Sequence, residues 1–204
     1  KLDAGCARAG IRPPGLLSPV FSQALAATTE GFSRSSQTEN LNLKTESPRL
    51  VGLSLGSNLG DRLGHLQAAR DRLRALADPT RPFLEAPVYQ TSPVNCPPGS
   101  PDFLNTAVAF HFPGSATDLH AATRLIESAL GRPARRIRNA PRPIDIDILT
   151  FGDESITGPG LTIPHPRLTS RRFVLQPLAD ILPNLVLPGD SLTIADHLVR
   201  LPAE

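Results

Sequence analysis

The chain has 204 residues, a length that suits one domain with a sizeable core and is too short for two large ones. Its formal net charge of +2 excludes a surface coated with positive charge for nucleic acid or membranes, so we expect neither partner. The two cysteines, Cys6 and Cys96, are too few for a disulfide framework or a zinc site, and no apolar run reaches the ~20 residues of a membrane span. We expect a cytoplasmic monomer, although the sequence alone leaves oligomerisation open.

Residues 1–49 differ from the rest in composition. Ser, Thr, Asn and Gln dominate "TTEGFSRSSQTENLNLKTESP", which predicts a disordered or weakly docked N-terminal arm, with a brief helix in "GLLSPVFSQALAA" as its one ordered element. The arm is rich in Arg and Ser and has few acids before Glu30, so a transit peptide to an organelle stays open. The first residue is not Met, which leaves open a fragment or a processed product.

Regular structure is predicted from residue 50 onward. The apolar run from Leu50 to Leu55, followed by Gly56, indicates a buried strand and a loop. In "DRLGHLQAARDRLRALAD" apolar residues recur three or four apart, which predicts a helix that ends before Pro79. Its charged residues are expected mostly in solvent: Arg70, Asp71, Arg72 and Arg74. The residues expected on its core-facing side are Leu63, Leu66, Ala69, Leu73 and Leu76.

Three further strands and two helices follow. Pro87 makes "FLEAPVYQTSP" an edge or bulged strand, while "DFLNTAVAFHF" alternates as a strand should, with Phe103 and Asn105 on one face. A helix begins at the N-cap Ser115 and stops at Gly131. The strand Ile144 to Phe151 comes next, and "RRFVLQPLADILP" predicts a last short helix broken or kinked at Pro177.

The order β-α-β-β-α-β indicates the α+β class. We predict a ferredoxin-like antiparallel sheet with helices on one face, plus C-terminal additions, over residues 50–204.

The chemistry is concentrated in "RRIRNAPRPIDIDILTFG". Side chains two apart on a strand point the same way, so Asp145 and Asp147 share one face, and Ile144, Ile146 and Ile148 are buried on the other. Two neighbouring carboxylates repel each other unless a cation lies between them. Mg²⁺ suits this pair because it binds one or two carboxylates together with substrate phosphates.

An arginine cluster precedes this strand. A bare D-x-D pair is usually just exposed, and an arginine run is usually a solvated face. Their combination favours polyphosphate transfer, with the metal and the phosphates lying between carboxylates and guanidinium groups and so keeping them apart. "GSNLGDR" has neither the Walker lysine nor the G-x-G-x-x-G spacing, which disfavours a P-loop kinase and a Rossmann dehydrogenase.

Two other functions remain as rivals. A glycosyltransferase could use the D-x-D pair for a nucleotide sugar, but the chain is short for that architecture. A ferredoxin-like RNA binder would need exposed aromatic residues on its sheet, which "FLNTAVAF" does not supply.

"APRPIDIDIL" resembles the signature of the 6-hydroxymethyl-7,8-dihydropterin pyrophosphokinase family of folate biosynthesis. The resemblance extends in collinear order over about residues 50 to 190 and includes "LSLGSNLGDR", "VYQTSPV", "PDFLNTAVAF", "IESALGR" and "LTIPHPRLTSRRFVLQPLADILP". It implies a ferredoxin-like fold, two Mg²⁺ ions, and transfer of pyrophosphate from ATP to the pterin's hydroxymethyl group with release of AMP. No part of the chain resembles a fused dihydropteroate synthase or aldolase.

The resemblance also implies roles for individual residues. Asp145 and Asp147 match the metal-binding aspartates. The resemblance implies that the catalytic basic residues around the triphosphate are Arg132, Arg135 and Arg142. It implies further ATP contacts from Glu127, His165 and Arg171. The residues it implies for the pterin pocket are Thr91, Val94, Phe103, Asn105 and Phe173.

Some of these residues have a plainer interpretation. Without the resemblance, Phe103 and Phe173 would be assigned to the core, and His165, between two prolines, to a turn. Arg136 and Arg138 are expected to be solvated, and Gly56, Ser57 and Asn58 to shape the first loop. Ala134, Asn139 and Gly160 stand where some family members carry Arg, Trp and Arg, so contacts that close over ATP are expected to differ here.

Overall fold

The computed structural model describes residues 47–94, 97–133 and 140–202. They belong to one compact unit, Lys44–Glu204. The predictions for the arm up to residue 46, and those for Cys96, Ala134, Arg135, Arg136, Arg138 and Asn139, lie outside the described residues.

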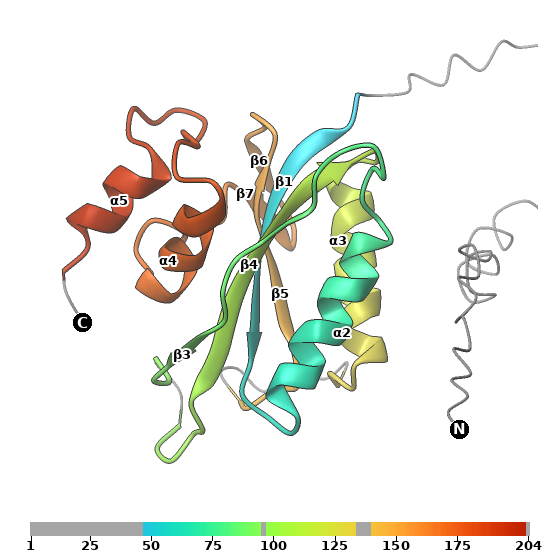
Figure 1. The fold of residues 1–204 in the computed structure, drawn as a ribbon, viewed down its shortest axis with the longest axis vertical. Helices are drawn as coiled ribbons and strands as arrows, with labels where there is room; N and C mark the ends of the chain where they lie inside the picture. Colours follow the sequence, from blue (N-terminus) through green and yellow to red (C-terminus); the bar gives the residue numbers. More distant parts are fainter. Residues whose placement is uncertain (1–46, 95–96, 134–139, 203–204) are drawn as a thin grey trace, which may run out of the picture. The chain divides into compact units, whose positions relative to one another are not determined.

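The element order confirms the predicted fold class. The unit begins with the βαββαβ order of a ferredoxin-like fold, in which β2 and β3 together occupy the place of one edge strand (Figure 1). The elements are β1 (Arg49–Ser57), α2 (Arg62–Arg74), β2 (Leu84–Glu85), β3 (Tyr89–Thr91), β4 (Phe103–Phe112), α3 (Ala116–Ala129), β5 (Asp145–Phe151), β6 (Ile156–Gly158), β7 (Leu161–Ile163), α4 (Arg172–Ile181) and α5 (Ile194–Arg200).

The main sheet has the strand order β2-β4-β1-β5, and β3 also pairs with β4. Every one of these pairings is antiparallel. Pro87 separates β2 from β3, as expected of a residue that cannot donate to a ladder. The central position of β1 explains why Val51–Ser57 are all buried: both its edges are paired and both its faces are covered.

Two hydrophobic layers enclose the sheet. On one face, α2 and α3 pack against β1, β4 and β5 through residues such as Leu66, Leu119 and Phe110. On the other face, the C-terminal additions pack through Leu175 and Ile194, and Figure 1 shows α4 and α5 on the side opposite to α2 and α3. The helices of the βαββαβ order therefore share one face, and the additions cover the other.

Three predictions about α2 and its surroundings need correction. Leu63 is 60% exposed, because the core-facing stripe is narrower than predicted and consists of Leu66, Ala69 and Leu73. The helix ends at Arg74, so Leu76 packs from the following turn. Arg70 is half-buried and donates to the carbonyl of Ala86 at 2.7 Å. A long side chain can reach from a helix flank to a backbone carbonyl between two strands, which periodicity does not reveal.

The C-terminal part also differs from its prediction. Helix α4 runs through Pro177 without a break, and α5 follows it, so α4 is not the last helix. A hairpin of β6 and β7 was not predicted, because strands of three residues are too short for a periodic signal. Gly160 has a φ of +80° in the turn between them, a conformation that favours glycine.

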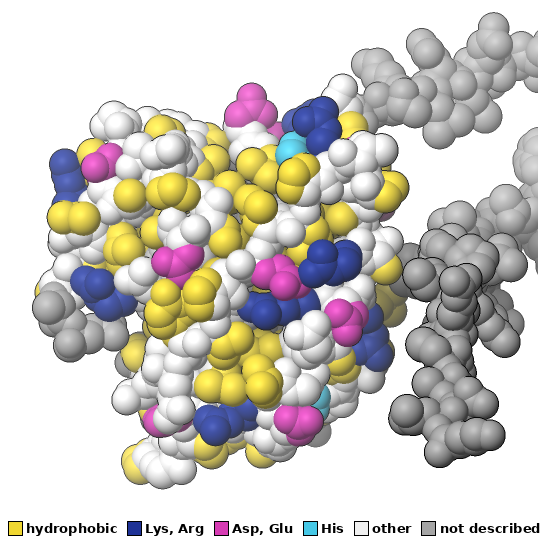
Figure 2. Space-filling model, viewed as in Figure 1, with side chains coloured by type: hydrophobic (Ala, Val, Ile, Leu, Met, Phe, Trp, Pro, Cys, Tyr) yellow, Lys and Arg dark blue, Asp and Glu magenta, His cyan; other side chains and the backbone are white. Residues whose placement is uncertain are grey.

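The described surface carries mixed charges. On the face drawn in Figure 2, basic and acidic side chains are interspersed among hydrophobic ones. Across the described residues, no helix combines the length and apolar character needed to cross a membrane.

Candidate active site

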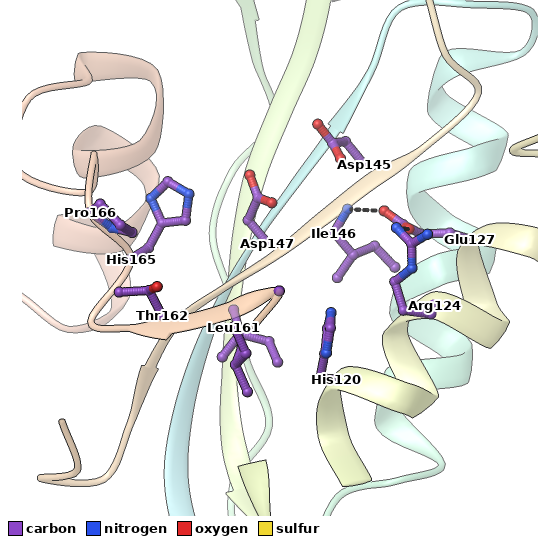
Figure 3. A pocket seen from close by; sticks show the side chains of 12 residues that line it. His120, Arg124, Glu127, Asp145, Ile146, Asp147, Leu161, Thr162, His165 and Pro166 are labelled. Atoms are coloured by element: carbon purple, nitrogen blue, oxygen red, sulfur yellow. Dashed lines mark hydrogen bonds and ion pairs between the residues drawn. The ribbon is translucent and has the colours of Figure 1, made fainter. Parts of the chain in front are cut away.

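Strand β5 directs two carboxylates into a cavity. Ile144, Ile146 and Ile148 are at most 6% exposed, as predicted, and the alternation places Asp145 and Asp147 on the opposite side of the strand. Figure 3 shows both carboxylates projecting from β5 into this space. The cavity has a volume of about 580 Å³ and is lined by His120, Arg124, Glu127, Asp145, Ile146, Asp147, Ile148, Gly160, Leu161, Thr162, His165 and Pro166.

Asp145 has two arginine partners. Arg142 lies 2.8 Å from its Oδ2, and Arg132 pairs with its Oδ1. The guanidinium groups of these two arginines therefore contact one of the aspartates directly. Both arginines flank the start of β5, and a carboxylate partly removed from water pairs with the nearest guanidinium.

Asp147 lies in a different electrostatic setting. Among the residues that the structure describes, no Lys or Arg lies within ion-pair distance of it. Burial raises the pKa of the Asp147 carboxyl, and the negative charge of Asp145 raises it further. Such a carboxylate gains from a cation placed between it and its neighbour.

The donor set fits magnesium. Within the described ranges no cluster of three or more His, Cys, Asp or Glu side chains could hold a metal by itself. Mg²⁺ commonly takes one or two carboxylates and completes its shell with water and substrate phosphates. Asp145 and Asp147, side by side in an open cavity, offer that kind of partial site.

Glu127 fastens α3 to β5. It is 2% exposed, and its Oε1 accepts the backbone N–H of Ile146 at 2.9 Å. It also pairs with Arg132 and with Arg124, the latter at 3.2 Å. Burial raises the pKa of the Glu127 carboxyl despite these cations. Because Arg132 contacts both Glu127 and Asp145, the helix, the arginine and the strand form one connected network.

His165 faces Asp147 from the segment after β7 (Figure 3). The backbone N–H of Arg167 donates to its Nδ1 at 3.2 Å, so the proton of the neutral ring belongs on Nε2. Burial lowers the pKa of the His165 imidazole, which therefore stays neutral at physiological pH. Arg171, whose pKa is also lowered by burial, holds its guanidinium carbon 5.4 Å from the centre of the Phe173 ring.

Most residues predicted for the pterin pocket lie on one face of β4 or next to it. Phe103 and Asn105 are 8% and 4% exposed, and the amide of Asn105 donates to Thr91 Oγ1 at 2.7 Å. Gly56 makes room for this amide, since a Cβ there would lie 2.8 Å from Asn105 Oδ1. Val94 is 53% exposed, and Phe173 is half-buried on α4.

The structure joins part of the predicted set. Ion pairs and the shared cavity bring together Arg132, Arg142, Glu127, Asp145, Asp147 and His165. Arg142 links this group to the pterin side, because its guanidinium carbon lies 5.4 Å from the centre of the Phe103 ring. Arg135 lies outside the described residues.

Three polar residues of the cavity were not predicted from the sequence. His120 and Arg124 line it from α3 together with Glu127 (Figure 3). His120, Arg124 and Glu127 are spaced by four and then three residues, which places all three on one helix face. Once Glu127 is assigned to the site, this helical spacing predicts the other two beside it. Thr162 was missed because the hairpin that carries it was not predicted.

Similar proteins give a consistent picture. A 2-amino-4-hydroxy-6-hydroxymethyldihydropteridine pyrophosphokinase of Pseudomonas aeruginosa is 38% identical over 154 residues, which cover 76% of this chain and 93% of that protein. A protein of the same name from Bacillus subtilis is 40% identical over 129 residues, covering 63% of this chain and 75% of its own. A "Folate synthesis bifunctional protein, mitochondrial" of Pisum sativum is 36% identical over 81% of this chain, which spans only 31% of that protein.

Solved structures agree on the fold. A Plasmodium falciparum HPPK-DHPS chain crystallised with SDX-DHP superposes with a TM-score of 0.60 at 15% identity, covering 78% of this chain and 46% of that one. The present chain thus spans less than half of that longer protein. The family model described as 7,8-dihydro-6-hydroxymethylpterin-pyrophosphokinase matches residues 52–183. This match and the two bacterial relatives show that the chain belongs to the 7,8-dihydro-6-hydroxymethylpterin-pyrophosphokinase family.

Proposed function

We propose that this chain transfers the pyrophosphoryl group of ATP to the hydroxymethyl oxygen of 6-hydroxymethyl-7,8-dihydropterin and releases AMP, a step of folate biosynthesis. The observation that carries the proposal is the carboxylate pair of β5, which opens into a cavity of about 580 Å³ beside Arg132 and Arg142 in a member of this family. The names of the bacterial relatives support the same reaction.

The carboxylates are the proposed metal ligands. Asp145 and Asp147 would hold two magnesium ions together with phosphate oxygens, and Arg142 and Arg132 would then exchange part of their contact with Asp145 for the nucleotide. Bound Mg²⁺ supplies positive charge to phosphate oxygens and lowers the pKa of an attached hydroxyl.

The arginines would neutralise the charge that develops on the phosphate chain. Arg132 and Arg142 already pair with Asp145, which lines the cavity, and Arg135 is proposed for the same role. Among the described residues the buried Nε of Arg142 has no acceptor, and a substrate oxygen could supply one. Stabilisation of this kind needs no covalent intermediate, so in-line transfer depends on positioning and charge.

The remaining residues are proposed to bind the two substrates. Glu127, His165 and Arg171 would contact or shape the nucleotide site, with His165 donating from Nε2 as a neutral ring. Phe103 and Phe173 would enclose the pterin. The amide of Asn105 would read its edge, and the backbone of Thr91 and Val94 would contact it.

We further propose that the enzyme is a monomer and works in the cytoplasm. The organelle named for the pea relative keeps a transit role open for the arm, residues 1–49.

The decisive experiment measures AMP release from ATP in the presence of Mg²⁺ and 6-hydroxymethyl-7,8-dihydropterin. Wild-type protein should form AMP only when the pterin is present. Asp147→Ala should lower the rate at least about 1,000-fold without loss of folded protein, because the unsupported metal site no longer aligns the phosphates. Asp153→Ala, an exposed carboxylate just beyond β5, is the matched control and should keep the wild-type rate. AMP formation at normal speed by the Asp147 variant would refute the metal assignment.

A further inference from the structure

Asn58 lies directly after β1, at the point where the proposed nucleotide and pterin sides meet. Asn58 is 1% exposed, and its side chain contacts two separate segments of the chain. The Oδ1 atom accepts the backbone N–H of Arg142 at 2.8 Å, and the Nδ2 group donates to the carbonyl of Pro101 at 3.3 Å. The backbone N–H of Asn58 also donates to the carbonyl of Arg142 at 3.2 Å.

The partners determine the chemistry needed at this position. Arg142 stands between Pro141 and Pro143, so its N–H is the only backbone donor in that three-residue stretch. Pro101 offers only a carbonyl. A buried side chain that joins them must accept at one atom and donate at the other, as an amide does. These partners also fix which end of the Asn58 amide is the oxygen.

The two segments carry residues that contact each other. Arg142 reaches Asp145 at 2.8 Å and holds its guanidinium carbon 5.4 Å from the centre of the Phe103 ring. Phe103 follows Pro101 by two residues. Asn58 therefore anchors the backbone on both sides of the contact between Arg142 and Phe103, at the edge of the carboxylate pair.

We propose that Asn58 is a positioning residue that couples the nucleotide side of the site to the pterin side. It acts through the backbone of Arg142 and of the segment before Phe103, and does not touch the reacting atoms. The inference rests on the proposed function and goes beyond a role in shaping the first loop. It means that the two substrates are aligned by one shared buried amide.

A double-mutant cycle tests this coupling in the full chain. Asn58→Ala, Arg142→Ala and the double variant are compared for kcat, for KM of ATP and of the pterin, and for Tm. Asn58→Ala should raise both KM values and lower kcat/KM for each substrate by about 10- to 100-fold, since two backbone anchors are lost. The kcat/KM of the double variant should lie no more than about 3-fold below that of Arg142→Ala, because both changes remove the contribution of the same arginine.

Thr106→Ala is the matched structural control. Thr106 is also fully buried and also joins two segments, donating to the carbonyl of Ala86 at 3.0 Å and accepting from Arg70 at 2.6 Å. Thr106→Ala should lower Tm about as much as Asn58→Ala does. Its apparent kcat should fall only in proportion to the amount of folded protein, and both KM values should stay unchanged. Should Asn58→Ala not fold, Asn58→Ser enters the same cycle, because it keeps a polar group but cannot reach both partners.

Two results would overturn the inference while leaving the proposed function intact. The first is a double variant whose loss equals the product of the single losses. The second is unchanged KM values in the Asn58 variants, as in Thr106→Ala. A wild-type protein that forms no AMP would instead overturn the proposed function, and the inference with it.

Discussion

Asp147, a proposed metal ligand, illustrates how a charged residue in a cavity can be costly for the fold. It is half-buried beside Asp145, and both this loss of water contact and the neighbouring charge raise the pKa of its carboxyl above the ordinary value of 3.8. A raised carboxyl pKa means that the folded state binds the proton more tightly than the unfolded state. The stability that Asp147 contributes is therefore fully present below pH 3.8 and is lost as the pH rises through the higher pKa of the folded state.

The first prediction follows from this sign. Asp147→Asn removes a partly desolvated charge, so without magnesium it should raise Tm by about 3 °C near neutral pH. Thermal unfolding in EDTA measures the gain, which should vanish below pH 3.8, where the wild-type carboxyl is protonated too. Added Mg²⁺ should stabilise the wild type more than the variant. A variant less stable than the wild type at neutral pH would contradict the account.

His165 has the opposite dependence on pH. Burial lowers the pKa of its imidazole below 6.5, so the folded state resists protonation more than the unfolded state does. Its contribution to stability is present above pH 6.5 and is lost as the pH falls through the lower pKa of the folded state.

The second prediction concerns this loss. Between neutral pH and about pH 5, the Tm of His165→Gln should fall less steeply than that of the wild type, because the variant has no ring to protonate. Differential scanning calorimetry at several pH values gives the slope. His111→Gln, a change in β4 away from the cavity, provides the comparison. Equal slopes in wild type and His165→Gln would show that the ring does not control this loss.

At the scale of elements, α3 is both a core helix and one wall of the cavity. Its N-terminus has a complete capping box: Ser115 Oγ accepts the N–H of Asp118 at 3.1 Å, and Asp118 accepts the N–H of Ser115 at 3.0 Å. The start at Ser115 and the stop before Gly131 are as predicted, because caps depend on local residue types. Correct capping keeps Glu127 in register with Ile146 of β5.

The third prediction tests the cap. Ser115→Ala should lower the free energy of unfolding by about 1 kcal/mol, since an orphan N–H loses its acceptor. Urea unfolding at neutral pH measures the change. Ser128→Ala, an exposed position in the last turn of the same helix, should change it by less than about 0.5 kcal/mol. The rate per folded molecule should stay normal in both, and a selective loss of rate in Ser115→Ala would mean that the cap has a direct catalytic role.

At the scale of the whole molecule, the site depends on segments far apart in the sequence. Asn58 follows β1, Phe103 begins β4, Glu127 lies on α3, and the carboxylates lie on β5. The antiparallel order β4-β1-β5 brings these ends together, with Gly56 paired to both Asn105 and Asp145. All of them lie within the unit Lys44–Glu204.

The fourth prediction concerns the segment before that unit. A chain of residues 44–204 should keep kcat and both KM values within about 2-fold of the full-length chain, because a compact unit with its own core can fold by itself. Steady-state AMP formation and Tm, measured side by side with the full-length chain, test this. A loss of more than about 10-fold in kcat/KM would assign the first residues a part in catalysis.

The sequence by itself determined the long strands, the places of α2, α3 and α4, the fold class and the aspartate pair. These depend on local periodicity, and the pair could be placed because alternation on β5 needs no knowledge of neighbours. Only the tertiary structure decided that Arg132 and Arg142 contact Asp145, that His120 and Arg124 line the cavity, and that Asn58 joins two distant segments. Which side chains contact each other across the sheet depends on the strand order and on how buried polar groups find hydrogen-bond partners. No short stretch of sequence encodes either of these.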